Sequence, residues 1–317
     1  MPSLVSRRDF LAGSLGLASS SLTLRLPVGG RAPAPARLAV ISDLHHGLAP
    51  DALERFDIFL AAVAERDVDA VWQLGDFCYS DDGSAECLRR WHAVTKPRYN
   101  VLGNHDMDRV DKAAALTAWK MPARYYAVVL SGWRFVVLDL NHFRKDGALH
   151  AYANGNYFTD GASHNWADPE QILWLDKELR GSREPVILVS HQPVGLGARS
   201  GQLPEEQRQI LDLVSAAGRA NPAGRVACCL SGHLHVDRIE WNDGLPSICV
   251  NSASYFWSAG MRKYTAPLFA FLEFGSDGTL QITGRDAAFV ERPPPDSDGV
   301  LGRSASIASR RITLPTT

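Results

Sequence analysis

The sequence predicts an α/β fold in which buried strands alternate with helices and the sheets are mixed. Short apolar runs, typical of buried strands, recur along the chain. Between some of these runs, apolar residues return at helical spacing. Two later pairs of runs are joined by short turns, which indicates antiparallel hairpins within the same fold.

The strands and helices follow in chain order. The predicted buried strands cover residues 38–42, 70–74, 98–102, 186–190 and 226–230. A helix between the first two begins after Asp51, a favourable N-cap residue, and repeats its apolar side chains from Leu53 to Val63. A second helix is predicted over residues 169–179, because its apolar residues also share one face. The predicted hairpins pair residues 125–130 with 133–138, and residues 268–274 with 279–283.

Three segments depart from this alternation. Residues 141–168 show no periodicity and are predicted to form a functional loop or a mobile cover. Residues 291–317 begin with consecutive prolines, followed by Ser, Gly and Arg, and are predicted to be a Pro/Ser-rich tail outside the core. Residues 1–36 are read as a leader. A single catalytic domain over residues 37–290 is therefore expected, since no linker divides it.

The overall charge excludes some partners. Across 317 residues, 33 Lys and Arg stand against 35 Asp and Glu, and the formal charge is −2. A near-neutral chain without a basic run is not suited to wrapping nucleic acid or to lying on an anionic membrane. A hydrophobic content of 45% is enough for a sizeable core, so the chain is not a disordered protein.

Residues 1–36 resemble a bacterial twin-arginine export signal. Arg7 and Arg8 precede a weakly apolar stretch that holds no acid, and this stretch is too short and too rich in Ser and Gly to span a bilayer. The resemblance implies the twin-arginine translocase as a partner and a periplasmic or extracellular location, without a transmembrane anchor. Cleavage is expected after Gly30 or after Ala36. The alternatives are a disordered basic tail or a short amphipathic helix of a cytosolic protein.

The cysteines predict no metal site. The chain has five of them, none in a CxxC pair. Cys228 and Cys229 lie in an apolar run and are predicted to be buried thiols. A bridge between Cys78 and Cys87 is left open for an oxidising compartment.

Potential metal ligands end the predicted strands or follow them closely. They are Asp43, His45, Asp76, Asn104, His191, His233 and His235. Because ligands bind at the carboxyl ends of strands in open α/β sheets, these distant residues are expected to converge. Nitrogen and oxygen donors without sulfur suit divalent or trivalent Fe, Mn or Zn. Seven ligands are too many for one tetrahedral ion, which predicts a pair of ions. Gly103 and Gly232 are expected to bring the backbone close to these ions.

The order of these motifs resembles the calcineurin-like metallophosphoesterase family over roughly residues 38–284. The motifs are Asp-x-His, Gly-Asp, Gly-Asn-His-Asp, a lone His after a strand, and Gly-His-x-His. The resemblance implies a four-layer αββα sandwich, in which two packed mixed sheets are flanked by helices. It also implies that Asp76 bridges the ions. One ion would be held by Asp43, His45 and His235, and the other by Asn104, His191 and His233.

The same resemblance implies a mechanism. A hydroxide between the ions would attack phosphorus, His105 would give a proton to the leaving group, and Asp106 would orient its ring. Tyr79 stands where purple acid phosphatases have a tyrosinate ligand. Those enzymes have Asp-x-Gly in the first motif, however, whereas this chain has His45. We therefore predict that His45 binds metal and that Tyr79 either contacts a metal ligand from outside or packs beside the site.

The predicted function is hydrolysis of small phosphomonoesters or phosphodiesters by an exported enzyme. The Asp-x-His motif is most similar to the bacterial cyclic-nucleotide phosphodiesterase branch, but export argues against an intracellular messenger as the substrate. A nucleotide, cyclic-nucleotide or phospholipid-headgroup phosphodiesterase is the alternative enzyme. A silent metal- or phosphate-binding envelope protein is disfavoured, because the ligand set is complete. Residues 255–257 are expected to line a substrate wall or to pack in the core. The oligomeric state is left open.

Overall fold

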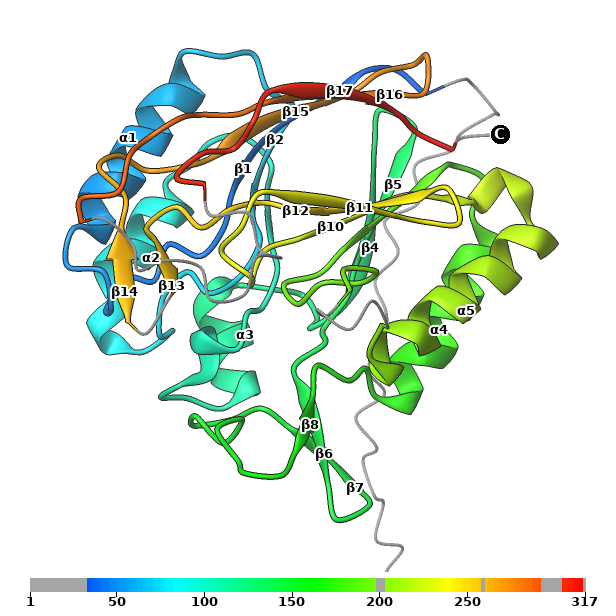
Figure 1. Cartoon of the computed structure of the whole chain (residues 1–317), viewed down its shortest axis with the longest axis horizontal. Coiled ribbons are helices and arrows are strands. Elements are labelled where there is room, and N and C mark those ends of the chain that lie inside the picture. Colours follow the sequence, from blue (N-terminus) through cyan, green and yellow to red (C-terminus); the bar gives the residue numbers. More distant parts are fainter. Residues whose placement is uncertain (1–32, 198–202, 258–259, 292–303, 316–317) are drawn as a thin grey trace, which may run out of the picture.

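Two six-stranded sheets pack face to face and helices cover their outer faces in the computed structural model, which describes residues 33–197, 203–257, 260–291 and 304–315 (Figure 1). The first sheet has the order β17 (Arg310–Thr313), β16 (Thr279–Thr283), β15 (Ala270–Phe274), β1 (Ala36–Ile41), β2 (Ala70–Gln73) and β3 (Arg98–Asn100). Its β1, β2 and β3 are parallel, whereas β15, β16 and β17 join antiparallel.

The second sheet is mixed in the same way. Its order is β11 (Arg238–Asn242), β12 (Leu245–Cys249), β10 (Val226–Ser231), β9 (Val186–Val189), β5 (Trp133–Val137) and β4 (Tyr126–Leu130). The inner strands β12, β10, β9 and β5 are parallel, and the edge strands β11 and β4 are antiparallel to their neighbours. Both predicted hairpins are present, as β4–β5 and β15–β16. The predicted mixed α/β sandwich is confirmed.

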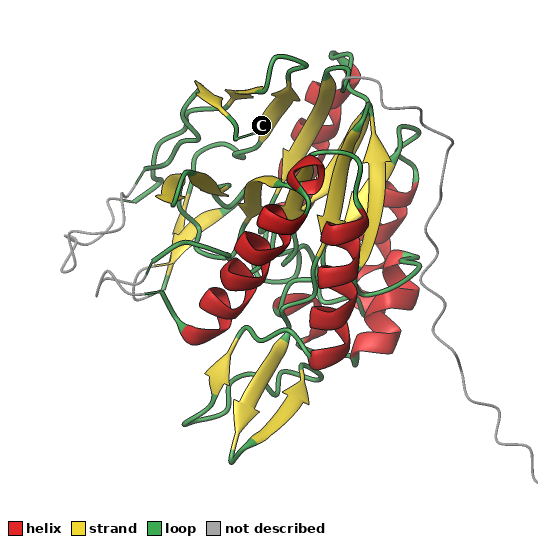
Figure 2. Cartoon of the chain, turned by 90° about the vertical axis from the view of Figure 1, so that its right-hand side faces the viewer, coloured by secondary structure: helices red, strands yellow, loops and turns green. Residues whose placement is uncertain are grey.

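Helices form the two outer layers. The first sheet carries α1 (Ala52–Ala64), α2 (Ala85–His92) and α3 (Lys112–Trp119), and the second carries α4 (Pro169–Gly181) and α5 (Glu205–Ala220), which lie in front of it in Figure 2. Short 3₁₀ turns are η1 (Asp82–Ser84), η2 (His105–Met107) and η3 (Pro222–Gly224). Asp168 caps α4 by accepting the N–H groups of Glu170 and Gln171. Asp51 precedes α1 as predicted, but its carboxylate binds Arg55 instead of capping the helix.

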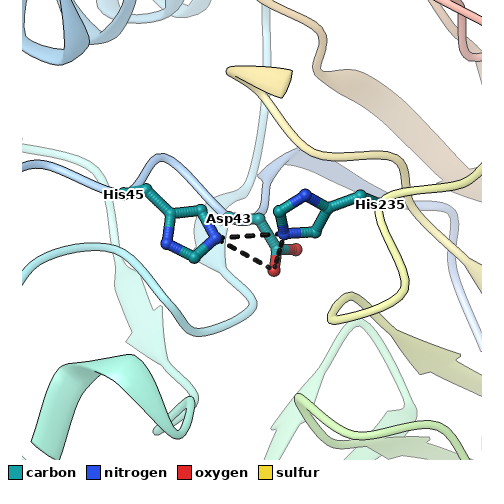
Figure 3. Close-up of side chains that lie close together, drawn as sticks. All are labelled: Asp43, His45 and His235. Atoms are coloured by element: carbon teal, nitrogen blue, oxygen red, sulfur yellow. Dashed lines mark hydrogen bonds and ion pairs between the residues drawn. The ribbon is translucent and has the colours of Figure 1, made fainter. Parts of the chain in front are cut away.

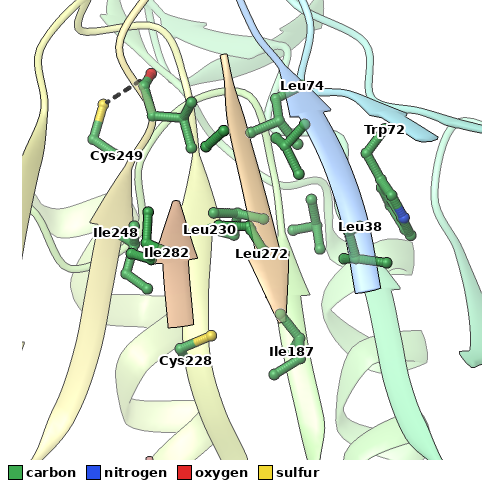
Figure 4. Close-up of a cluster of buried hydrophobic side chains, with 14 of the residues drawn as sticks. Leu38, Trp72, Leu74, Ile187, Cys228, Leu230, Ile248, Cys249, Leu272 and Ile282 are labelled. Carbon is green, nitrogen blue, oxygen red and sulfur yellow. Dashed lines mark hydrogen bonds between the residues drawn. The ribbon is translucent and has the colours of Figure 1, made fainter. Parts of the chain in front are cut away.

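Strand alternation divides the core into layers. Leu38 and Val40 of β1 point between the sheets, whereas Ala39 and Ile41 face the helices on the outer side. Figure 4 shows Leu38 and Leu272 of the first sheet in the same buried cluster as Leu230 of the second. This packing fixes the two sheets together, so the ends of their strands hold constant positions relative to one another.

The end of the chain corrects one prediction. Residues 304–315 do not form a tail, since β17 pairs with β16 and Ala305, Ile307 and Leu314 are buried in the core between the sheets. The Pro- and Ser-rich composition hid a short strand whose few apolar residues complete that core. Residues 292–303 of the predicted tail lie outside the described residues.

The start of the domain lies close to its predicted boundary. Ala36 is buried as the first residue of β1 and pairs with Phe274. Just before it, the N–H of Ala34 donates to the carbonyl of Ser131 at 2.7 Å. Residues 1–32 of the predicted leader lie outside the described residues. Among the residues that are described, no helix is long and apolar enough to cross a membrane.

Residues 141–168 are more regular than predicted. They hold a small sheet of β7 (Ala148–Ala151), β6 (His142–Lys145) and β8 (Ser163–His164), which projects from the bottom of the molecule in Figures 1 and 2. Asp146 and Gly147, both at positive φ, form the tight turn between β6 and β7. This Asp-Gly pair is typical of hairpin turns and could have predicted the hairpin from the sequence. We call residues 141–168 the insert.

Two smaller features complete the fold. A separate hairpin of β13 (Tyr255–Trp257) and β14 (Met261–Lys263) follows the second sheet. All five cysteines are buried and free, so the bridge left open between Cys78 and Cys87 is not formed. The predicted burial of Cys228 and Cys229 is confirmed.

Candidate metal centre

The loops that follow the parallel strands β1, β2 and β3 of the first sheet and β9 and β10 of the second meet at one place. Asp43, Asp76 and Asn104 follow β1, β2 and β3 of the first sheet, and His191, His233 and His235 follow β9 and β10 of the second. Acidic and histidine side chains from these loops form three groups that share members. Within each group the potential ligand atoms all lie within 4.8 Å of one another. The predicted convergence of residues far apart in sequence is therefore observed.

Asp43, His45 and His235 form the first group (Figure 3). Nε2 of His235 lies 3.2 Å from Oδ1 of Asp43 and 3.0 Å from Nε2 of His45. The His45 nitrogen lies 3.8 Å from the same carboxylate oxygen. Two imidazole nitrogens and a carboxylate oxygen thus face a common point, as ligands of one ion would.

Asp76, His191 and His233 form the second group. Nε2 of His191 lies 3.0 Å from Oδ2 of Asp76 and 3.3 Å from Nδ1 of His233. The same Oδ2 of Asp76 lies 4.0 Å from Nε2 of His45, which belongs to the first group. Asp76 therefore stands between the two groups, where a bridging carboxylate would be.

Asn104 supplies an independent test of fit. Its side chain is buried, and its Oδ1 finds no hydrogen-bond partner among the described residues. A buried acceptor without a partner is costly, typically about 1–3 kcal/mol. A cation would satisfy this oxygen, so the residues present fit a metal on this side of the centre as well.

The backbone of the centre is strained in a way that points to function. Asp43, His45, Asp76, His233 and His235 all have φ between 51° and 72°, in the left-handed region that non-glycine residues avoid. Each such residue costs roughly 1–3 kcal/mol, and strain of this kind concentrates at functional sites. Here it turns side chains that follow straight strands back toward a shared point.

Glycines allow the loops to approach one another. A Cβ on Gly103 would overlap the backbone and carboxylate of Asp76, and a Cβ on Gly232 would overlap Ser42 and Asp43. Glycine at these two positions therefore lets the backbone pass close to the candidate ligands Asp76 and Asp43.

Burial and mutual charge set the protonation of the ligands. Burial lowers the pKa of His45 to about 3, and burial together with the charge of His191 lowers the pKa of His233 to about 4. These rings are neutral near pH 7 and can bind metal. Burial also acts to lower the pKa of His191, but the charges of Asp76 and Asp43 outweigh it and raise the pKa to about 9. Without a cation, the proton on His191 compensates the two carboxylates.

Surrounding hydrogen bonds orient these side chains. Nδ1 of His191 donates to the carbonyl of Leu74 at 2.8 Å, which directs Nε2 toward Asp76. Oδ1 of Asp76 accepts the N–H of His105 at 2.7 Å, which leaves Oδ2 for the centre. The N–H of His233 donates to Oδ2 of Asp43 at 3.1 Å.

The predicted role of Asp106 is wrong. Its buried carboxylate accepts the N–H groups of Gly103 and Phe77, each at 2.8 Å, and so ties together the loops after β2 and β3. Asp106 does not orient the ring of His105, because its acceptor positions are already used by the backbone. It positions the loops that carry Asp76 and Asn104.

Asp108 and Tyr157 take the place predicted for Asp106. Nδ1 of His105 lies 2.7 Å from Oδ2 of Asp108, and the hydroxyl of Tyr157 donates to Oδ1 of the same carboxylate at 2.7 Å. Asp108 follows His105 by three residues across the η2 turn, a spacing that places both side chains on one face. The spacing of His105 and Asp108 could have predicted this contact from the sequence. The contact of Tyr157 could not have been predicted, because Tyr157 lies in the insert, far along the chain.

Tyr79 packs beside the centre. Its buried ring lies beneath the guanidinium of Arg109, with 3.9 Å from that carbon to the ring centroid. Burial raises the pKa of its phenol, which disfavours the tyrosinate that would bind metal. These contacts support the packing role predicted for Tyr79.

A sequence model described as calcineurin-like phosphoesterase matches residues 36–237, which is more than half of the chain. The chain belongs to the calcineurin-like phosphoesterase family. Membership confirms the predicted hydrolase acting on phosphoester bonds, and the ligand groups described above fit the metal sites of this family. A comparison with curated proteins finds no significant match.

Solved structures share the fold at low sequence identity. A dimetal phosphatase from Danio rerio is similar with a TM-score of 0.59 and 16% identity, over 81% of this chain and 99% of that one. GAP50, the anchor in the inner membrane complex of Plasmodium, has a TM-score of 0.55 and 14% identity, over 89% of each chain. At such identities the likeness concerns the fold, so the chemistry of this chain rests on its own residues.

Proposed function

We propose that the chain is an exported phosphoesterase that binds two metal ions and hydrolyses small phosphomonoesters or phosphodiesters. The observation that carries the proposal is the position of Asp76, whose Oδ2 faces His191 of one ligand group and His45 of the other. Two groups joined by one carboxylate are what a pair of ions requires.

The chain's own residues divide between the ions. Asp43, His45 and His235 would hold one ion, and His191, His233 and Asn104 the other, with Asp76 shared. These nitrogen and oxygen donors suit Fe, Mn or Zn. When bound, the ions would activate a water molecule and neutralise charge on the phosphoryl oxygens.

His105 serves as the acid that protonates the leaving group. Its Nδ1 is engaged by Asp108, which leaves Nε2 available to give a proton. Burial opposes protonation of this ring, but the charges of Asp76 and Asp108 outweigh burial and raise the pKa of His105. The ring is thereby kept in the form that an acid needs.

The leader supports export through the twin-arginine translocase to the periplasm or beyond. Cleavage after Gly30 is favoured over cleavage after Ala36, because the latter would remove a buried residue of β1 and the bond from Ala34 to Ser131. Mass spectrometry of the exported protein tests this, and we expect a mature chain that begins after Gly30. Export that persists when Arg7 and Arg8 are both replaced by Lys would argue against this route.

The activity is tested by stripping the protein with a chelator and restoring Mn, Fe or Zn. A phosphomonoester, a phosphodiester and a cyclic nucleotide are then offered at equal concentration. We expect hydrolysis of at least one substrate to return with metal, and to be lost in Asp76→Asn. Asp111→Asn, at the exposed N-cap of α3, should retain it, because Asn is also a favourable N-cap residue. Full metal-dependent hydrolysis by Asp76→Asn would contradict the proposal.

A further inference from the structure

Two large aromatic side chains stand exposed beside the candidate metal centre. Phe158, on the insert, is 72% exposed, and Trp257, at the end of β13, is 63% exposed. Leaving such surfaces in water forgoes the gain of burying them, so exposed aromatic groups that border a site commonly serve to bind a ligand. Of residues 255–257, Tyr255 and Phe256 are buried and Trp257 alone faces solvent.

Both side chains connect to the centre through rings in contact. The ring of Phe158 lies 6.2 Å from that of His105, measured between centroids. On the other side, Trp257 lies 6.3 Å from Tyr255, whose ring is 4.9 Å from His45. The rings of His45 and His105 are themselves 5.1 Å apart. A row of rings therefore runs from Phe158 across the centre to Trp257.

The position of Phe158 has a chemical consequence. The oxygen of the leaving group has to reach His105 to receive its proton, so the group attached to that oxygen lies beside the His105 ring. Phe158 borders that ring and comes from the insert, whereas Trp257 approaches from β13. A leaving group that extends away from His105 would thus meet an exposed aromatic face.

We propose that this site takes phosphoesters whose leaving group carries a flat aromatic ring, which stacks on Phe158 at the His105 end of this row. The proposal rests on the phosphoesterase function proposed above and adds the class of leaving group to it. A flat ring fits because it offers a large apolar area and the offset or edge-to-face geometry that aromatic pairs prefer. Stacking of this kind is worth about a tenfold gain in affinity.

The test measures binding as well as turnover. Phenylphosphonate and methylphosphonate are not hydrolysed and differ in the ring alone, so titration calorimetry of each into the Mn-loaded protein isolates its contribution. We expect phenylphosphonate to bind about tenfold more tightly. Phe158→Ala should remove most of this preference and leave the Kd of methylphosphonate unchanged. Trp241→Ala is the matched control, because Trp241 on β11 is 53% exposed and belongs to none of these rings.

The outcomes separate the two proposals. Equal affinity for both phosphonates, or a preference that Phe158→Ala leaves intact, would overturn the aromatic site while hydrolysis of phosphoesters continued. Phe158→Leu keeps the apolar bulk without the ring, so an undiminished preference in that variant would also overturn it. If neither phosphonate binds and no phosphoester is turned over by the metal-loaded protein, the phosphoesterase proposal itself fails. Turnover is compared between phenyl phosphate and an alkyl phosphate whose leaving alcohol has the same pKa as phenol.

Discussion

Replacing Asp108 by Asn is the sharpest probe of the candidate acid. The change keeps the size of the side chain but removes the charge that holds Nδ1 of His105 at 2.7 Å and that helps to raise the pKa of this ring. A hydrogen bond to a charged group is worth about 1.5–3 kcal/mol, and every 1.4 kcal/mol is tenfold in rate. We therefore expect kcat to fall about ten- to hundredfold where the leaving group needs a proton.

The assay compares two aryl phosphates that can stack in the same way but differ in how much their leaving groups need a proton. Phenyl phosphate has a poor leaving group, whereas 4-nitrophenyl phosphate releases a stable anion. Asp108→Asn should slow the first strongly and the second little. Tyr157→Phe should act in the same direction but more weakly, because it removes a neutral hydroxyl 2.8 Å from Nδ1 of His105 and leaves the charge of Asp108 in place. An equal loss with both esters would refute the reasoning. So would a loss selective for phenyl phosphate in Asp106→Asn but absent in Asp108→Asn.

Three further results are expected. The pKa of His191 is raised to about 9, so metal binding near pH 7 should release a proton, and the metal affinity should increase as the pH rises toward 9. Binding heats that are the same in buffers of different ionisation enthalpy would contradict this. Gly103→Ala should lower the free energy of unfolding by about 1–3 kcal/mol in urea titrations, through its overlap with Asp76, whereas Gly181→Ala, with open space around it, should not destabilise the fold. Ile307→Ala should cost about 2–5 kcal/mol in the same titration, and a loss below 1 kcal/mol would mean that residues 304–315 add little to the core.

The ligands of the centre could be predicted because strand order carries the information. Asp43, Asp76 and His191 each follow a short apolar run, and the ends of such strands meet whatever the details of the loops. The mixed α/β fold followed from the same runs together with the two hairpins, and the four-layer sandwich from the family resemblance. Local turn chemistry would have added β6 and β7, since Asp146-Gly147 is a typical hairpin turn.

The contacts of His105 could not be predicted in the same way. Asp106 is its neighbour in sequence, but the turn at η2 points the Asp106 carboxylate at backbone N–H groups and brings Asp108 to the ring. Tyr157 is 52 residues from His105 and reaches it only because the insert folds over the centre. Strand β17 was missed because its apolar residues are too few to show a period amid Pro and Ser. These features depend on tertiary packing, which no local pattern records.

The central claim is that Asp76 joins two ions within one chain. Metal content by mass spectrometry, measured after loading with Mn and removal of the excess, tests it most directly. We predict two ions per chain in the wild type, about one in His235→Ala, which loses a ligand of the first group alone, and fewer than one in Asp76→Asn, which weakens both. A single ion in the wild type, or two ions retained by Asp76→Asn, would contradict the account.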